Sequence, residues 1–227
     1  METEVVVAPD LAALARTASL RLARGIETAV REREWCWLAL SGGAFAAPIY
    51  DELATLQVPW PKVEFYFTDE RCVPTSHPAS NYGGALDRLF TNPRIGSHQV
   101  HRIEGERPDH GAVAEAYERE LPEAFDLMLV EMGLDGHFAG IFPGSPALEE
   151  TERLAVAVEV PLKPRKRITL TPPVFERAGE IVVVATGREK AERVGRALHG
   201  PLEPAELPAQ LLRSAIWILD RAAAAGL

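Results

Sequence analysis

The stretch FDLMLVEMGLDGH, Phe125 to His137, decides the fold class of this chain. A mostly apolar run, Phe125 to Met132, ends directly in a glycine-rich polar motif, Gly133 to His137. Such a run is typical of a strand that is buried on both faces, as the strands of parallel sheets are. We therefore expect the motif to lie at the carboxyl end of a strand in a parallel sheet.

Three more strand-like runs end in polar motifs in the same way. The motifs are Ser41-Gly42-Gly43 after Trp35 to Leu40, Thr68 to Arg71 after Val63 to Phe67, and Thr186 to Lys190 after Ile181 to Ala185. In an open parallel sheet the carboxyl ends of the strands lie along one edge, and ligands bind there. All four motifs are therefore predicted to converge on one cleft.

Segments with helical spacing alternate with these runs, which is the β-α rhythm of a parallel sheet. They are a helix from Leu11 toward Glu34 capped by Asp10, and stretches at Tyr50 to Leu56, Asn81 to Phe90, Ala112 to Leu121 and Glu189 to Leu198. We predict an α/β fold, a parallel sheet flanked by helices, in a single domain that spans residues 1–227.

The later part of the chain is less regular. Residues Ala155 to Val160 and Arg167 to Leu170 are rich in β-branched types, but Pro161 and Pro164 interrupt the strands that they predict. We therefore allow for a small second lobe here. Ser214 to Leu219 predicts a final strand before an alanine-rich terminal helix.

The composition limits the partners. With 24 Lys and Arg against 33 Asp and Glu the net charge is −9, whereas a general nucleic-acid surface needs an excess of basic residues. No apolar run approaches the ~18 residues that span a membrane, and no signal peptide is recognisable. We expect a cytoplasmic protein without nucleic-acid or membrane partners. Cys36 and Cys72 form no C-x-x-C pair and are expected to be reduced, packed thiols.

The motif Ser41-Gly42-Gly43 joins a strand to a helix. Paired glycines let a ligand approach the backbone, and the N–H groups that open a helix favour an anion such as phosphate. For an isolated S-G-G, a tight turn without a ligand is about as good an interpretation. The chain has neither G-x-G-x-x-G nor G-K-[ST], so nucleotide-triphosphate and nicotinamide cofactors lose their main sequence support.

His137 is the candidate base. Its imidazole titrates near physiological pH, Asp135 supplies a carboxylate two residues away, and Gly136 places both in a turn. A histidine that only hydrogen-bonds its loop is the alternative. Asp69 and Asp135 could also be metal ligands, but without H-x-x-x-H or D-x-D spacing we predict no metal site.

Three cations are candidates for binding an anion. Arg71 follows Asp69 and Glu70 at one strand end, and Arg167 and Lys190 stand elsewhere in the chain. A guanidinium can hold carboxylate, phosphate or a developing oxyanion with two parallel hydrogen bonds. The alternatives are a salt-bridged loop for Arg71 and solvated charges for the other two.

Taken together, the ordered motifs resemble the 6-phosphogluconolactonase family from about Val5 to Ala224. They are L-S-G-G at Leu40 to Gly43, T-D-E-R-C-V-P at Thr68 to Pro74, S-N-Y-G at Ser80 to Gly83, M-G-L-D-G-H at Met132 to His137, F-P-G-S at Phe142 to Ser145, R-I-T-L-T at Arg167 to Thr171 and T-G-R-E-K-A at Thr186 to Ala191. The resemblance implies a modified Rossmann-like fold shared with glucosamine-6-phosphate deaminases and no cofactor. It also implies hydrolysis of a small phosphorylated sugar lactone, 6-phosphoglucono-δ-lactone, to 6-phosphogluconate in the pentose phosphate pathway.

The resemblance also implies roles for individual residues. His137 would be the general base. The phosphorylated sugar would be surrounded by Ser41, Gly42, Gly43, Arg71, Arg167 and Lys190, and the pocket lined or braced by Asp69, Asn81, Asp135 and Gly136.

Two segments depart from the family pattern. Ala44-Phe45-Ala46 stands where Ser-Thr-Pro is common, so two hydroxyl donors are missing, and Phe138 to Ile141 stands where Thr-Ala-Ser-Leu is usual.

Two rival functions remain. A sugar-phosphate isomerase or deaminase would resemble D-G-H-I-A-F-N-E-P, but Phe142 replaces its glutamate. The other is an inactive sugar-phosphate sensor that uses the same cleft.

Overall fold

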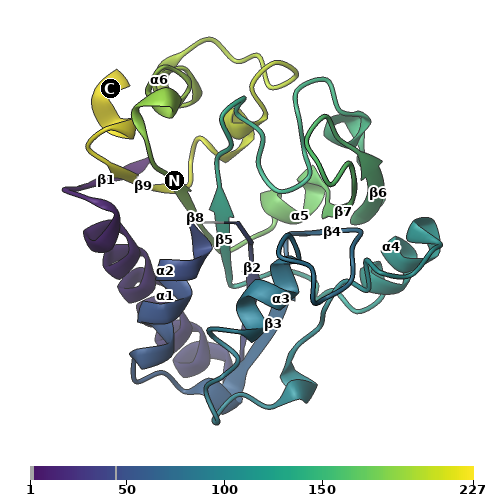
Figure 1. Cartoon of the computed structure of the whole chain (residues 1–227). Helices are drawn as coiled ribbons and strands as arrows, with labels where there is room; N and C mark the ends of the chain where they lie inside the picture. Colours follow the sequence, from purple (N-terminus) through teal and green to yellow (C-terminus); the bar gives the residue numbers. More distant parts are fainter. Residues whose placement is uncertain (1–2, 44) are drawn as a thin grey trace.

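A computed structural model describes residues 3–43 and 45–227. In this part of the chain six strands form one parallel sheet in the order β1-β9-β8-β5-β2-β3 (Figure 1). The strands are β1 (Glu4–Ala8), β2 (Cys36–Leu40), β3 (Val63–Phe67), β5 (Leu127–Glu131), β8 (Glu180–Ala185) and β9 (Ile216–Asp220). The parallel α/β sheet predicted from the apolar runs is therefore confirmed.

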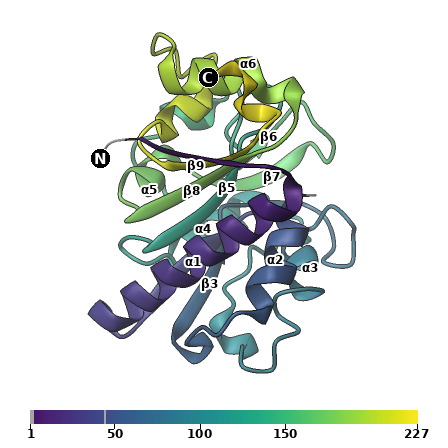
Figure 2. The ribbon, with the colours of Figure 1, turned by 90° about the vertical axis from the view of Figure 1, so that its left-hand side faces the viewer.

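Helices lie between the strands in sequence. They are α1 (Leu11–Arg33), α2 (Ala46–Thr55), α3 (Asn81–Leu86), α4 (His110–Glu118), α5 (Pro172–Glu176) and α6 (Ala191–His199). Asp10 caps α1 as expected, because its carboxylate accepts a hydrogen bond from the backbone N–H of Ala13 at 2.8 Å. Figure 2 shows α1 lying across one face of the sheet, where it contacts β1, β9, β8, β5 and β2.

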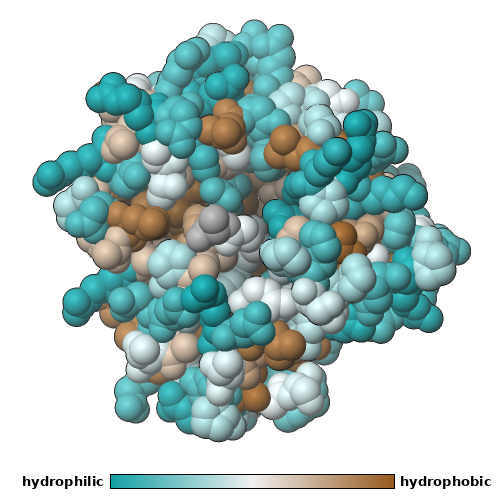
Figure 3. All heavy atoms as spheres, viewed as in Figure 1, coloured by the Kyte–Doolittle hydropathy of each residue, from teal (hydrophilic) through white to brown (hydrophobic). Residues whose placement is uncertain are grey.

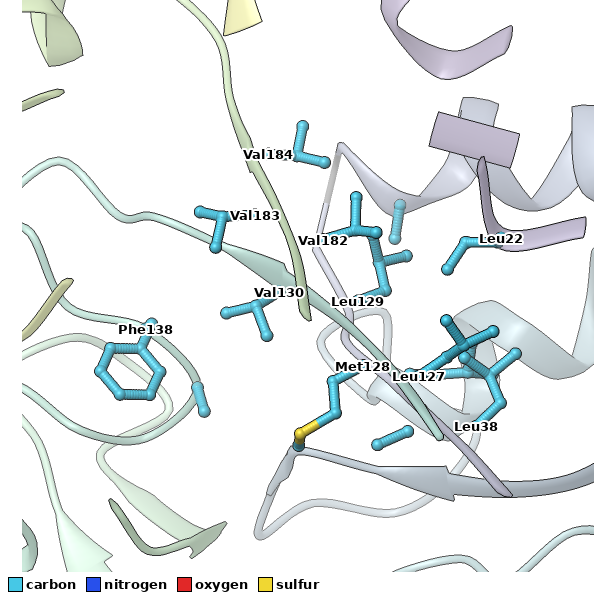
Figure 4. Packing of buried hydrophobic residues seen from close by; sticks show 14 of the residues in the cluster. Leu22, Leu38, Leu127, Met128, Leu129, Val130, Phe138, Val182, Val183 and Val184 are labelled. Carbon is cyan, nitrogen blue, oxygen red and sulfur yellow. The ribbon is translucent and has the colours of Figure 1, made fainter. Parts of the chain in front are cut away.

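The core lies on both faces of β5. Figure 4 shows Leu127 and Leu129 on the side of Leu22 from α1, while Val130 points to the opposite side, toward Phe138. Residues of a strand alternate between the two faces, so a strand covered on both sides must be apolar throughout. This double burial is the reason that Leu127 to Val130 form a continuous apolar run, and only the last residue of β5, Glu131, is charged.

A second sheet of three antiparallel strands, β4 (Asp69–Arg71), β7 (Lys166–Leu170) and β6 (Ala155–Glu159), stands where a small lobe was allowed for. The segment Asp69 to Arg71, for which a salt-bridged loop was the alternative interpretation, is a short strand that pairs with β7. Thr68 joins the two sheets, because its N–H donates to Leu40 at 2.8 Å and its carbonyl accepts from Leu170 at 2.9 Å.

Some element bounds differ from the expectations. Helix α2 begins before Tyr50, because Pro48 falls in its first turn, where a missing N–H costs nothing. Strand β1 has no counterpart in the predicted strands. The alanine-rich end forms only a short 3₁₀ turn, Ala223–Gly226, in place of an α-helix.

Both cysteines are packed thiols. Cys36 is buried in β2, and burial raises the pKa of the Cys72 thiol to about 11. Neither side chain is therefore poised as a thiolate near neutral pH.

No described helix combines the length and the apolar character that a membrane span requires. On the face seen in Figure 3, hydrophobic residues lie in small groups among hydrophilic ones.

Candidate active site

The four polar motifs leave four neighbouring strands. In the sheet these strands stand in the order β3, β2, β5 and β8, and all of them run in the same direction. Their carboxyl ends therefore lie side by side at one edge, as the sequence predicts.

His137 and Asp135 form a close pair at the end of β5. The Nδ1 atom of His137 lies 2.5 Å from Oδ1 of Asp135, which also accepts the His137 backbone N–H at 3.1 Å. Burial alone would raise the pKa of the Asp135 carboxyl, but the hydrogen bonds and charge of His137 outweigh it and hold that pKa below its usual value. An ionised carboxylate can only accept a hydrogen bond, so the proton of the neutral imidazole is expected on Nδ1. The lone pair is then on Nε2, which can act as the base.

Gly133 provides the space for the imidazole. Its N–H donates to the His137 carbonyl at 2.8 Å, so the chain folds back and lays the ring over the glycine. A Cβ atom at residue 133 would lie 2.0 Å from Cε1 of His137. The glycine is therefore required by close packing against the candidate base.

We expect Gly133→Ala to lower kcat on the order of 10-fold, because the added methyl must push the imidazole out of line with Asp135. Steady-state kinetics on the folded variant test this. Gly84→Ala is the matched control, since a Cβ there meets no atom within 4 Å. Equal kcat values for Gly133→Ala and Gly84→Ala would contradict the role of Gly133 in making space for the imidazole.

Phe142 packs against the candidate base. Its ring stacks on the His137 imidazole with the centroids 3.9 Å apart and the planes 12° apart. The guanidinium carbon of Arg167 lies over the same ring, 5.3 Å from its centroid. The Phe142 ring therefore contacts both the candidate base and Arg167, so these two side chains lie close to each other in the site.

Arg71 and Arg167 stand directly opposite each other in the antiparallel pair of β4 and β7. Asp69 is the nearest carboxylate, with Oδ2 3.3 Å from Nη1 of Arg167 and 4.0 Å from Nε of Arg71. Burial lowers the pKa of the Arg167 guanidinium, partly offset by Asp69. Two guanidiniums share one carboxylate, and both Nε atoms are buried without a hydrogen-bond partner among the described residues. With two guanidiniums on one shared carboxylate and buried N–H groups left over, the cluster offers hydrogen-bond donors to an anion.

Asn81 and Glu70 brace the cluster. Nδ2 of Asn81 donates to the carbonyl of Asp69 at 2.7 Å and to its carboxylate at 3.1 Å. Glu70 is buried and accepts hydrogen bonds from the N–H groups of Asn81 and Arg71, both at 2.7 Å. Gly42 packs so closely that a Cβ would lie 1.9 Å from Oδ1 of Asn81. The first glycine of the S-G-G motif is therefore explained by packing.

Lys190 is buried and reaches β5 from the segment after β8. Its Nζ donates to Oε1 of Glu131 at 2.7 Å. The Glu131 carboxylate lies 3.4 Å from where a Cβ of Gly43 would be, and Gly43 has a φ of 106°, which favours glycine. Lys190 is thus brought to the S-G-G motif and is paired, not solvated.

The start of α2 faces the same region. Phe45 precedes its first residue and offers no side-chain hydrogen bond to the helix. The backbone carbonyl of Ser41, which is buried, accepts a hydrogen bond from the Tyr50 hydroxyl. Of the departure Ala44-Phe45-Ala46, Ala44 lies outside the described residues.

A groove of about 880 Å³ opens beside these residues. Gly42, Gly43 and Arg71 line it together with residues of α2 and α3, Asn81 among them. His137, Arg167 and Lys190 are not part of its lining. The groove therefore borders the S-G-G motif and Arg71 but does not include the candidate base.

The predicted residues form two groups in the structure. The contacts described above link the first group, which consists of Asp135, His137, Arg167, Asp69, Arg71, Asn81 and Gly42. In the second group, Lys190 is connected to Gly43 through Glu131. Gly136 adopts a φ of 85° and packs on Leu207, which makes it a turn residue. Sequence reasoning missed the contacts of Phe142, Glu131 and Gly133, although Phe142 opens the quoted F-P-G-S motif.

Within residues 3–43 and 45–227, no three His, Cys, Asp or Glu side chains are grouped so as to hold a metal ion. The absence of a metal site stays a prediction, which the effect of a chelator can test.

A parallel α/β fold with a histidine and several cations at the carboxyl edge of the sheet is typical of an enzyme that acts on an anionic substrate. The chain belongs to the family of glucosamine-6-phosphate isomerases and 6-phosphogluconolactonases, whose model matches residues 9–218.

Individual proteins point in the same direction. The chain is 34% identical to a 6-phosphogluconolactonase of Mycobacterium tuberculosis over 100% of this chain and 99% of that protein. It is also similar to the structure of 6-phosphogluconolactonase from Trypanosoma brucei, with a TM-score of 0.89, 27% identity and coverage of 100% and 99% of the two chains. A monomeric glucosamine-6-phosphate deaminase, 20% identical with a TM-score of 0.86 over 100% of both chains, shares the fold.

Proposed function

We infer that this chain hydrolyses 6-phosphoglucono-δ-lactone to 6-phosphogluconate in the pentose phosphate pathway. The observation that carries the proposal is the hydrogen-bonded pair of Asp135 and His137 at the edge of the sheet. The ring of Phe142 contacts both His137 and Arg167, so the pair lies close to a cation. A δ-lactone is an activated ester, so one base and a few hydrogen-bond donors are enough for its hydrolysis. The names of the relatives support the same reaction.

In the proposed mechanism His137 is the general base. Its Nε2 takes a proton from the water that attacks the lactone carbonyl, and the imidazolium that forms is stabilised by the Asp135 carboxylate on Nδ1. Collapse of the tetrahedral intermediate breaks the bond to the ring oxygen, and His137 returns the proton to that oxygen. Neither a metal ion nor a covalent intermediate is needed for these steps.

The cations have two anionic groups to bind, the developing oxyanion and the substrate phosphate. Arg71 and Arg167 share one carboxylate and have buried Nε–H groups without a partner among the described residues, which supports binding of an anion. Lys190 and the backbone from Ser41 to Gly43 form the second candidate position. Phosphate binding far from the reacting carbon accelerates the reaction only if it holds that carbon in place.

A deaminase is the less favoured function. The resemblance places a glutamate of the deaminases at the position of Phe142, and here an apolar ring is stacked on His137 at that position. An inactive sugar-phosphate sensor is the second alternative. It would bind the phosphorylated sugar without turning over the lactone.

The decisive experiment follows the disappearance of 6-phosphoglucono-δ-lactone with purified protein against its spontaneous hydrolysis. We expect a rate proportional to protein concentration and well above the background. A background rate combined with binding of 6-phosphogluconate would support the sensor, and release of ammonia from glucosamine 6-phosphate would support the deaminase.

Activity is expected to survive EDTA unchanged, because a water activated by His137 needs no metal ion to attack a lactone. The lactonase rate before and after dialysis against the chelator tests this. Loss of activity on dialysis with recovery on adding zinc or magnesium would contradict the metal-free mechanism.

We also propose that residues 1–227 form a single domain, which is supported by one continuous core that includes Ile168 and Leu170 of the second sheet. The cytoplasmic location and the absence of a nucleic-acid partner stay predictions of the sequence.

A further inference from the structure

Phe142 contacts two functional candidates without having a polar group of its own. The ring is buried, stacks on the His137 imidazole at 3.9 Å, and lies beneath the Arg167 guanidinium at 5.3 Å. A leucine would fill a core position as well. The parallel arrangement with the imidazole therefore calls for an explanation beyond burial.

The segment that carries Phe142 is held in place independently of these contacts. The N–H of Gly140 donates to the Thr169 hydroxyl of β7 at 2.9 Å, and a Cβ at Gly140 would lie 2.6 Å from Cβ of Thr169. The N–H of Ile141 donates to the carbonyl of Phe138 at 2.9 Å. The aromatic ring is thus fixed to the second sheet and can act as a rigid surface for the histidine.

An aromatic face has a consequence for proton transfer that an aliphatic side chain lacks. Its negative quadrupole attracts a cation lying over it, and the attraction strengthens where water is excluded. Neutral imidazole gains little from this attraction, whereas imidazolium gains much more. The charged groups near His137 are Asp135 from its own loop and Arg167 from β7, whose guanidinium contacts the same Phe142 ring.

We propose that Phe142 is a positioning residue for the hydrolysis, whose ring fixes the plane of the His137 imidazole and stabilises the protonated form that arises during proton transfer. The proposal rests on the proposed function. It adds a second, non-polar support to the one that Asp135 provides, and the two supports hold the imidazole by its edge and by its face.

The test compares three variants of the full chain. Phe142→Leu removes the aromatic face, Phe142→Tyr restores it, and Phe138→Leu is the matched control. Phe138 lies four residues before Phe142, is equally buried, and packs edge-on against Phe175 of α5 at 4.9 Å. Its truncation removes a core ring from the same segment while leaving the stack on His137 intact.

We expect Phe142→Leu to lower kcat about 3- to 10-fold with a smaller change in KM, and to move both the acid limb of the pH profile and the NMR titration midpoint of His137 to lower pH. Phe142→Tyr should restore both quantities. Phe138→Leu should lower thermal stability and leave the acid limb where it is in the wild type.

An unchanged titration midpoint in Phe142→Leu would overturn the proposal, even if kcat fell, because a fall in kcat alone also follows from loosened packing. The same midpoint shift in Phe138→Leu would overturn it too. The NMR titration needs no turnover, so a wild-type protein that lacks lactonase activity would refute the proposed function without hiding the effect of Phe142 on the imidazole.

Discussion

His137→Ala is expected to lower kcat for 6-phosphoglucono-δ-lactone by ~10²- to 10⁴-fold, the usual contribution of general acid–base catalysis. The affinity for 6-phosphogluconate should change little, because the proposed phosphate ligands are other residues. In the wild type, kcat/KM should rise with pH through one ionisation, as the imidazole loses its proton. The lowered pKa of Asp135 keeps its carboxylate ionised throughout that rise.

His101→Ala is the matched control for this substitution. The His101 ring also contacts a carboxylate, Glu64 at 2.9 Å, and also stacks on an aromatic ring, Tyr66 at 4.3 Å. Its contacts are to β3 and to Glu120, which follows α4, and none of them involves the loop after β5. A His137→Ala enzyme with near-normal kcat, or one no slower than His101→Ala, would remove His137 from the mechanism.

Much of the fold could be predicted because the relevant signals are local. The run Val63 to Phe67 has the same bounds in sequence and structure, because all of its residues except Glu64 are apolar and buried, although β3 is an edge strand of the sheet. Strand β1 lies at the other edge and was missed; Val5 and Val7 are exposed there. Its three valines next to Pro9 give too short a pattern to distinguish a strand from an extended terminus.

The site could be predicted only where its residues are close in the sequence. Asp135 and His137 are separated by one residue, so their pairing follows from a turn. The position of Arg71 opposite Arg167 depends on the register of β4 with β7, which no local pattern fixes. Glu131 was part of a predicted strand, and Phe142 was noted only as the first residue of the F-P-G-S motif and as the replacement of the deaminase glutamate. Their contacts with Lys190 and His137 arise only from tertiary packing.

The second large effect concerns phosphate recognition by Arg167 and Lys190. Replacing either residue by Ala should cost a charge-assisted hydrogen bond of roughly 1.5–3 kcal/mol, or about 10- to 150-fold in kcat/KM for the phosphorylated lactone. Rates on unphosphorylated glucono-δ-lactone should scarcely change, because that substrate has no group for these cations to bind. The measurement is therefore the ratio of kcat/KM for the two lactones in each variant.

Both cations are paired in the structure, and this makes controls necessary. Arg167→Ala leaves Asp69 facing Arg71 alone, and Lys190→Ala leaves Glu131 without its partner. Thermal unfolding of each variant therefore accompanies the kinetics. Arg165→Ala is the matched control, since this arginine is also paired, with Glu159 at 3.0 Å, but its side chain is 60% exposed.

Equal losses on the two lactones would assign Arg167 or Lys190 to the reacting carbonyl or to the fold. A difference between the two residues would be informative as well. If only Arg167→Ala discriminates between the lactones, the phosphate lies on the arginine pair of β4 and β7, and Arg71→Ala should then discriminate to a similar extent. If only Lys190→Ala does, the phosphate lies at the start of α2, and the arginine pair is left to stabilise the oxyanion beside His137.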